Sequence, residues 1–365
     1  MKKFLLAFLI ICLTLFSALF VASCNGSSSE QSSSPTQSSS SSSSSKTDET
    51  VAYTRIDENG TENENGSYIL FGSYPQTDVT SSVSSTLSSY VSTKPTSSSL
   101  NGWTSYKYYI ESSNATDYMW YKDVDEDSNG AYDYRAVYFT SYRPYYTGYS
   151  STADHTKQDE NGYTTGNIYW FKYEPIKWRI LNEANGSATI LAEMILDSQD
   201  YNYTDSSRTI NGQTIYANNY EYSSIRAWLN ESFYNTAFSD LQKEIIQTVE
   251  VDNSANNRYA CSNTQDKVWL LSQQEVTREI YGFNTDYSAY DTARRKKTTA
   301  YSQCQGAWTS SVISSYAGNG RWWLRSPNYD YGHYSRCVTC NGSTINDYYV
   351  NSTNFCVVPA LQIAL

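Results

Sequence analysis

Few residues in this sequence have the types and spacing that catalysis needs. Its two histidines, His155 and His333, stand in polar, loop-like stretches with no nucleophile elbow or zinc-binding motif beside them. Cys337 and Cys340 have the spacing of half a zinc ribbon, but no second cysteine pair or histidine pair follows at ligand spacing. We therefore expect no catalytic site, no metal site and no cofactor.

An acidic stretch offers the alternative of calcium binding. Spaced carboxylates can supply the hard oxygen ligands that calcium prefers. An EF-hand loop would require a glycine at Ser128 and a bidentate acid at Tyr134, and this chain has neither. We favour a solvated acidic hairpin turn, with Asp123, Asp125, Asp127 and Gly130 between strands at Tyr118–Lys122 and Tyr134–Thr140.

Aromatic residues are the outstanding feature of the composition, with 36 tyrosines and nine tryptophans. A tyrosine buries an apolar ring and keeps a hydroxyl for water or a ligand, which suits extracellular binding surfaces and also ordinary extracellular β proteins. We expect Trp322 and Trp323 to anchor the core. The polar loop that follows Pro327 holds the candidate ligand contacts, which are Asn328, Tyr329, Asp330, Tyr331 and His333.

The net charge of −11 argues against nucleic acid or an anionic membrane surface as a partner, because both require a basic face. The one cationic run, Arg294–Lys297, is interpreted as a solvated loop or an internal charge partner rather than a binding site.

The elements that must position these residues alternate between strands and helices. A first strand is expected at Tyr68–Tyr74, followed by a Ser/Thr-rich surface excursion at Thr80–Ser99. The clearest hairpin is at Trp170–Asp197, with its turn at Asn185 and Gly186, which tolerate positive φ.

Helices are expected where apolar residues recur at helical spacing, at Ile225–Phe233 and Leu241–Val249. Capping boxes mark Ser239 with Gln242, and Ser272 with Glu275 before a shorter helix. Val268–Leu271 is predicted as a short strand. A second hairpin turning at Asn341-Gly342 and a last strand at Cys356–Leu365 complete the chain. Strands, two or three helices and strands again predict a mostly antiparallel α+β domain whose last strand returns to pair near the first.

The N-terminus has the pattern of a secretion signal. Lys2 and Lys3 precede an apolar run from Phe4 to Phe20, and Val21-Ala-Ser-Cys24 resembles the bacterial lipobox. We interpret residues 1–23 as a lipoprotein signal peptide and Cys24 as the acylated residue, carrying fatty-acyl chains such as palmitate. The alternative is an ordinary cleavage site with an incidental cysteine.

The boundaries that follow are a Ser-rich disordered tether at 24–50 and one folded domain at 51–365. This organisation predicts secretion across the cytoplasmic membrane and attachment to the cell envelope through the lipid, with the domain facing outward.

Five motifs occur along the folded part: Phe71-Gly-Ser-Tyr-Pro-Gln, Glu174-Pro-Ile-Lys-Trp-Arg-Ile-Leu, Ser224-Ile-Arg-Ala-Trp-Leu-Asn, Trp322-Trp-Leu-Arg-Ser-Pro and Val358-Pro-Ala-Leu. Together, over about residues 68–365, they resemble the bacterial domain-of-unknown-function family numbered 6273. The closing pattern is more distantly similar to the C-type lectin-like fold, shared with formylglycine-generating proteins. The chain departs from the family at Cys356, Val357 and Val358, where Gly-Val-Arg is usual. Since the family does not ordinarily have cysteines at positions 337 and 356, a Cys337–Cys356 disulfide is expected outside the cytoplasm.

Three functions are compatible with these patterns. The first is a non-catalytic module that displays a binding surface for a glycan or an envelope or host protein. The second is a structural or adhesion component of the envelope. The third is an enzyme of the formylglycine-generating type using Cys337 and Cys340, whose spacing and flanks differ from those of that family. We expect the first, and no enzyme.

Overall fold

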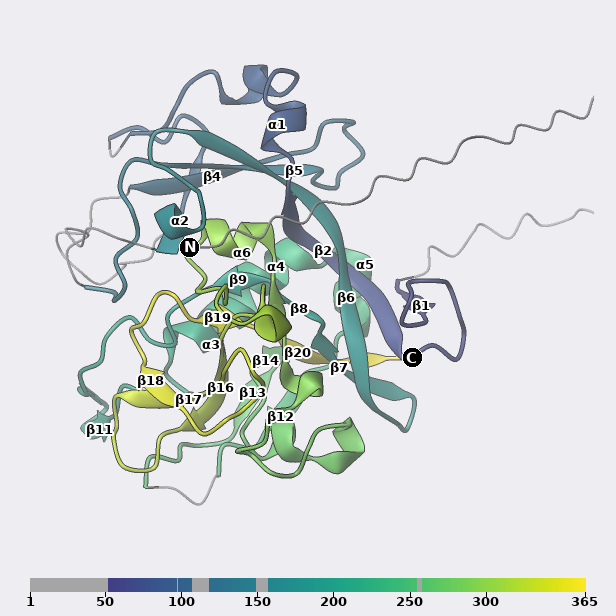
Figure 1. Ribbon diagram of the computed structural model, residues 1–365, viewed down its shortest axis with the longest axis vertical. Helices are drawn as coiled ribbons and strands as arrows, with labels where there is room; N and C mark the ends of the chain where they lie inside the picture. The colour runs from purple at the N-terminus through teal and green to yellow at the C-terminus, as the bar shows by residue number, and fades with distance from the viewer. Residues whose placement is uncertain (1–51, 97, 107–117, 149–156, 255–257) are drawn as a thin grey trace, which may run out of the picture. The chain divides into compact units, whose positions relative to one another are not determined.

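The computed structural model describes residues 52–96, 98–106, 118–148, 157–254 and 258–365 (Figure 1). The predicted signal peptide, the acylated Cys24, the tether and His155 lie outside these residues. The compact unit of the fold spans Thr50–Leu365. Among the described helices, none has the length and apolar character needed to cross a membrane.

The long strand β6 (Ile168–Ala184) organises the main sheet, as Figure 1 shows. One edge of β6 pairs with β2, and the other pairs first with β5 and then with β7. All pairings in this sheet are antiparallel, which confirms the predicted mostly antiparallel α+β class. The other strands are β1 (Thr54–Ile56), β2 (Tyr68–Asp78), β3 (Thr104–Ser105), β4 (Met119–Val124), β5 (Tyr134–Phe139), β7 (Ser187–Ala192), β14 (Val268–Trp269) and β20 (Ala360–Ala364).

The predicted hairpin at Trp170–Asp197 is confirmed as β6 and β7. Its turn residues Asn185 and Gly186 have φ values of 53° and 72°, the left-handed conformation that these residue types tolerate best. The terminal strand β20 pairs with β7 and β14, so two strands separate it from β2. It therefore returns to the sheet of the first strands without pairing with them.

A second sheet contains the Trp-Trp motif. Its order is β18 (Asp347–Tyr349), β17 (Tyr334–Val338), β16 (Trp322–Pro327), β19 (Cys356–Val357) and β9 (Asp197–Ser198). Trp322 and Trp323 are both fully buried, as predicted. Their indole N–H groups donate to the carbonyl oxygens of Arg294 at 3.1 Å and Gln199 at 2.9 Å. Because each indole has a polar partner, both rings can lie in the core without an unsatisfied donor.

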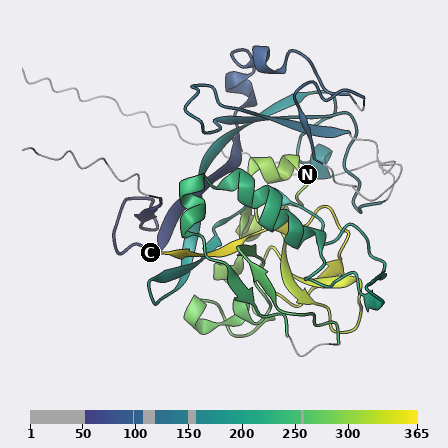
Figure 2. The ribbon, with the colours of Figure 1, turned by 180° about the vertical axis from the view of Figure 1, so that it is seen from behind.

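Helical segments cover one face of the main sheet (Figure 2). In the core, Phe238 contacts the rings of Phe71 and Trp178. The predicted capping box of Ser239 and Gln242 is present. The second predicted helix is shorter than expected, because the chain becomes extended at Ile246 and Val249 belongs to a strand. The helices are α1 (Thr80–Val83), α2 (Lys157–Glu160), α3 (Ser224–Trp228), a π-helical turn (Leu229–Phe233), α4 (Tyr234–Ala237), α5 (Asp240–Ile245) and α6 (Ala300–Cys304).

Short ladders and 3₁₀ turns make up the rest. Ser272 and Glu275 cap each other as predicted, but they open only 3₁₀ turns at Glu275–Thr277 and Glu279–Tyr281. The remaining strands are β8 (Met194–Ile195) parallel to β15 (Lys297–Thr298), β10 (Arg208–Ile210) with β11 (Gln213–Ile215), and β12 (Val249–Val251) with β13 (Thr264–Asp266).

The Ser/Thr-rich stretch at Thr80–Ser99 is more than a surface excursion. It contributes Leu87 and Val91 to a small second core, where they pack with Trp103 and Trp120. Its serines and threonines face solvent or cap local turns. The stretch therefore covers one face of β4 and β5 with very few apolar side chains.

Two residues of the cationic run, Arg294 and Lys296, turn inward, as one of its two interpretations predicted, whereas Lys297 is exposed. Arg294 is fully buried, and its guanidinium donates to carbonyl oxygens of Val276, Gly342 and other loop residues. Lys296 is 1% exposed and pairs with Glu193 at 2.7 Å. These two buried cations thus connect the loops that carry their hydrogen-bond partners.

The expected Cys337–Cys356 disulfide is wrong, because both cysteines are free thiols. Cys337 on β17 lies opposite Trp323, whereas Cys356 on β19 lies opposite Trp322, so β16 runs between them. Two strand spacings separate their Cα atoms by about 10 Å, beyond the roughly 7 Å limit for a disulfide.

Candidate functional site

The predicted ligand loop, residues 328–333, connects the end of β16 to the start of β17 in the second sheet. Asn328 is 5% exposed, and its Oδ1 accepts hydrogen bonds from the backbone N–H groups of Asp330 and Tyr331, both at 2.7 Å. Its Nδ2 donates to the carboxylate of Asp347. Asn328 therefore fixes the shape of the loop, and the exposed members of the predicted set are Tyr329, Asp330 and Tyr331.

The loop joins a group of aromatic side chains, which we call the aromatic surface and define as Tyr146, Tyr331, His333, Tyr334 and Tyr349. The ring of His333 stacks on Tyr349 with centroids 5.5 Å apart, and Tyr331 lies 5.8 Å from His333. Tyr146, from a distant part of the chain, meets Tyr349 edge-on at 5.9 Å. Tyr331 is 55% exposed, so part of this surface is open to a ligand.

A hydrogen bond with Tyr349 raises the pKa of Tyr334 to about 12, so the hydroxyl of Tyr334 is neutral at physiological pH. The surface therefore combines apolar ring faces with tyrosine hydroxyl groups. Sequence reasoning found Tyr331 and His333 but missed Tyr146, Tyr334 and Tyr349, although the tyrosines of the C-terminal hairpin were a visible signal.

Beside this loop the structure has a small polar cleft that the sequence did not reveal. It has a cavity volume of about 20 Å³, which is room for about one or two water molecules. Segments from four parts of the chain converge on it. The cleft is lined by Asn218, Tyr220, Asp252, Asn253, Tyr259, Cys261, Ser272, Gln274, Arg325, Ser326 and Pro327.

Arg325, the cation of the Trp-Trp-Leu-Arg-Ser-Pro motif, is the central residue of the cleft. It is 5% exposed and pairs with the carboxylate of Glu275. Its Nη1 donates to Leu270 O at 2.9 Å and its Nη2 to Asp252 O at 3.0 Å. Its Nε is buried and has no hydrogen-bond partner among the described residues.

Two asparagines add unpartnered acceptors to the cleft. Asn218 is fully buried, and its Nδ2 donates to the carbonyl oxygens of Tyr331 at 3.0 Å and Tyr334 at 2.9 Å. Asn253 is 7% exposed, and its Nδ2 donates to Ser262 O at 3.0 Å. The Oδ1 atoms of both asparagines are buried without a partner in the described part of the chain. Buried polar atoms in this state are rare and call for an explanation.

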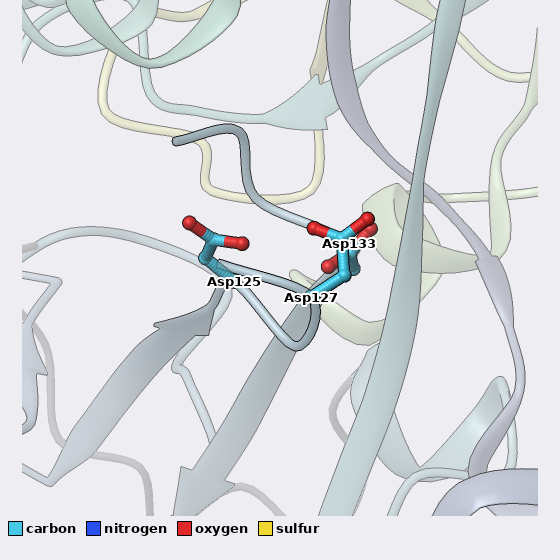
Figure 3. Close-up of side chains that lie close together, drawn as sticks. All are labelled: Asp125, Asp127 and Asp133. Atoms are coloured by element: carbon cyan, nitrogen blue, oxygen red, sulfur yellow. The ribbon is translucent and has the colours of Figure 1, made fainter. Parts of the chain in front are cut away.

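The acidic hairpin forms as predicted between β4 and β5, and it brings together Asp125, Asp127 and Asp133 (Figure 3). One oxygen from each carboxylate lies within 4.8 Å of the others. Backbone N–H groups of the same turn occupy several of these oxygens: Asn129 and Gly130 donate to Asp125, at 3.1 and 2.8 Å. These local bonds account for the cluster. Asp123 instead lies on β4 and pairs with the buried Arg135.

The cysteines proposed for an enzyme are poorly suited to nucleophilic chemistry. Cys337 is fully buried, and burial raises its pKa to about 12. A thiol with this pKa is protonated at neutral pH, whereas thiol chemistry requires the thiolate. Cys340 is half-buried just beyond β17, and His333 contacts aromatic rings.

Comparison with known proteins adds one match. Residues 185–365 match the model of a family described as "Domain of unknown function (DUF6273)". This is the family predicted from the five motifs, although the match is shorter than the predicted 68–365. No curated protein and no solved structure matches the chain.

Proposed function

Because residues 185–365 belong to the DUF6273 family, whose description states no activity, we propose a function from the chemistry of the chain itself. The protein is a lipid-anchored component of a bacterial cell envelope, and its aromatic surface binds glycan without catalysis. Its mixed, mostly antiparallel fold is compatible with the finer proposal of a C-type lectin-like domain.

The observation that carries this proposal is the aromatic surface together with the exposed Tyr329, which lies on the same loop as Tyr331. Sugar rings present apolar C–H faces that pack on aromatic rings, while tyrosine hydroxyls hydrogen-bond the sugar hydroxyls. Tyr329 and Tyr331 are 59% and 55% exposed on a loop that Asn328 holds in shape. Exposed tyrosines on a fixed loop lose little freedom when they bind a ligand, which favours affinity.

The location supports the same function. The lipobox ending at Cys24 and the Ser-rich segment after it suit display on the outside of a membrane, where envelope polymers and host glycans are found. The buried, protonated thiol of Cys337 and the lack of a nucleophile beside His333 in the described residues favour binding over catalysis.

The test is a screen of the full chain, purified in detergent, against a glycan array and isolated envelope polymers, with and without calcium. We expect saturable binding to a glycan. Replacing Tyr329 and Tyr331 together by alanine should weaken it at least about tenfold, because two stacking contacts are lost. The matched control replaces Tyr287 and Tyr290, which are 54% and 65% exposed and are not part of the aromatic surface, and should bind like the wild type.

Three results would contradict the proposal. One is that the folded protein binds no glycan, and another is that it binds saturably to a protein and to no glycan. The third is self-association at low concentration, measured by sedimentation, without any ligand, which would favour the structural alternative.

A further inference from the structure

We propose that a cationic patch, formed by Arg295, Lys297 and Arg321, binds the carboxylate or phosphate groups of an acidic glycan. This inference rests on the proposed glycan binding, because it names the chemical class of glycan that the protein prefers. The patch shares no residue with the aromatic surface, so each can be tested alone.

Two residues of the patch come from the outward-facing half of the cationic run. The chain is extended at Arg295, and successive side chains of an extended segment point to opposite sides. Arg295 and Lys297 therefore lie on the other side of the chain from the buried Lys296. Lys297 is exposed, and the half-buried Arg295 has its guanidinium carbon 4.9 Å from the centre of the Tyr316 ring. These two cations are available to a ligand.

Strand register brings the third cation, Arg321, alongside Arg295. Lys297 forms an antiparallel bridge with Asn319, and the next pair along is joined by a backbone hydrogen bond of 3.0 Å. Continuing this register by one more pair places Arg321 opposite Arg295. Directly opposite residues of an antiparallel ladder share a face and have Cβ atoms about 5 Å apart. The two arginines thus present their charges on the same side of the ladder.

The guanidinium of Arg321 is held in place with one edge open. Its central carbon lies 4.0 Å from the ring centre of Trp308, and its Nη1 donates to the hydroxyl of Tyr348 at 3.0 Å. Its Nε and Nη2 have no hydrogen-bond partner among the described residues, and neither atom is buried. These two N–H groups form the fork that binds the two oxygens of a carboxylate or phosphate.

No acid neutralises the cationic patch in the described part of the chain. None of its three residues forms an ion pair there. Residues 292–329 include six lysines and arginines and no aspartate or glutamate, although the net charge of the chain is −11. Since like charges directly opposite each other destabilise a ladder, an anion bound between Arg295 and Arg321 would relieve their repulsion.

The acids on the elements around the patch are engaged elsewhere. Asp286 is exposed, but its carboxylate accepts hydrogen bonds from the backbone N–H and the hydroxyl of Ser288, at 2.8 and 2.7 Å. Three further acids pair with other cations: Asp291 with Arg294 at 3.3 Å, Glu193 with Lys296 at 2.7 Å and Asp347 with Arg336 at 3.6 Å. The patch therefore keeps a positive charge that attracts an anion.

The size and surroundings of the patch favour a glycan over other polyanions. Nucleic acid and anionic membranes require a wide basic face, whereas this acidic protein offers three cations. The half-buried Trp308 beside Arg321 adds apolar surface against which a sugar ring can pack. Tyr348, which holds Arg321, is the neighbour of Tyr349 on β18, and neighbouring strand residues point to opposite faces. The patch and the aromatic surface are thus separate contact points for one polymer.

The test uses the full chain in detergent and isothermal titration calorimetry with two pairs of glycans. Oligogalacturonate is compared with its methyl ester, and phosphomannan with unphosphorylated mannan. In at least one pair the acidic glycan should bind about tenfold or more tightly than its neutral counterpart. Preference in the first pair identifies a carboxylate ligand, and preference in the second identifies a phosphate ligand. Raising the salt from about 50 mM to about 500 mM should weaken only the acidic glycan.

Substitutions locate the preference. Arg295→Gln combined with Arg321→Gln should weaken the acidic glycan about tenfold or more and leave the neutral one unchanged, since charged hydrogen bonds are lost. The matched control, Lys94→Gln with Lys172→Gln, removes the same charge from exposed positions and should bind like the wild type. Thermal unfolding verifies that each variant is folded. Lys297→Glu, at an exposed position, is a second test that disturbs no packed side chain.

Acidic binding that persists in the folded double variant and in Lys297→Glu overturns the patch, as does equal binding of acidic and neutral glycans. DNA or phosphatidylglycerol vesicles bound as tightly as the acidic glycan would overturn it as well.

Failure of the patch and failure of the proposed function give different results. Neutral glycan binding that is lost with Tyr329 and Tyr331, without any acidic preference, overturns the patch and leaves the proposed function intact. Acidic binding that depends on Arg295 and Arg321 but not on Tyr329 and Tyr331 supports the patch and overturns the role of the aromatic surface. A folded protein that binds neither kind of glycan overturns both.

Discussion

Asp197 illustrates how single residues join the two sheets of this protein. It starts strand β9 of the second sheet and is 1% exposed. Its Oδ2 accepts a hydrogen bond from the hydroxyl of Tyr74, on β2 of the main sheet, at 2.7 Å, and its Oδ1 accepts one from the N–H of Ser198 at 2.7 Å. Burial nevertheless dominates and raises the pKa of Asp197 to about 6.

This raised pKa predicts a pH dependence of stability. Between about pH 4 and pH 6 the folded protein keeps a proton that the unfolded chain releases, so the free energy of unfolding falls as the pH rises. Relative to Asp197→Asn, which cannot ionise, the wild type should lose about 2 kcal/mol between pH 4 and pH 7. Urea unfolding of both proteins at several pH values measures this difference. A difference that stays constant with pH would show that the carboxyl is ionised without penalty.

At the same scale, the candidate site shows which residues a sequence can reveal. Tyr329 and Tyr331 were identifiable because a tyrosine-rich loop after a strand is a local pattern. Asn218 and Asn253 could not be identified, because the local sequence does not show whether an asparagine in a loop is buried. Their importance depends on meeting Arg325, more than 70 residues further along the chain, and only the folded structure brings these three side chains together.

At the scale of elements, β16 explains why the cysteines stay apart. It pairs with β17 on one side and with β19 on the other, so Cys337 and Cys356 face the same strand from opposite edges. We expect iodoacetamide to label both in urea without a reductant. In the native protein both should be protected, together with the buried Cys304, while the half-buried Cys340 reacts. Peptide mapping by mass spectrometry identifies the labelled cysteines. A disulfide-linked pair of peptides containing Cys337 and Cys356 would contradict the prediction that both are free thiols.

The elements that sequence reasoning predicted correctly are those with local causes. The β6–β7 hairpin follows from Asn185 and Gly186, and the start of α5 follows from the capping box at Ser239. The pairing of distant strands had no such signal. Asn230 is one example: its Oδ1 accepts the N–H of Lys267 at 2.8 Å and its Nδ2 donates to Val268 O at 2.9 Å, which ties the π-helical turn to β14. Such a contact depends on the tertiary fold, and no periodic pattern in the sequence predicts it.

At the scale of the whole molecule, the sequence predicts two parts with different tasks. Residues 1–50 are predicted to deliver and anchor the protein, and the domain that begins near Val51 presents the aromatic surface. A flexible tether lets a displayed domain reach a polymer that is fixed in the envelope, and a lipid anchor keeps the domain concentrated there. Glycan binding by a weak individual site then becomes effective, because many anchored copies can engage one polymer.

The predicted division of tasks depends on Cys24. Cys24→Ser removes the thiol that is predicted to carry the acyl chains, so the variant should lose the lipid that attaches the protein to the membrane. In a bacterial host fed alkynyl palmitate, the wild type should be labelled and should partition into the detergent phase of Triton X-114, whereas the variant should be unlabelled and remain in the aqueous phase. Ala22→Ser, two residues earlier and similarly small, is the matched control and should behave as the wild type does. An unlabelled wild type in the aqueous phase would instead favour an ordinary cleavage site, and the domain would then act as a free secreted binder.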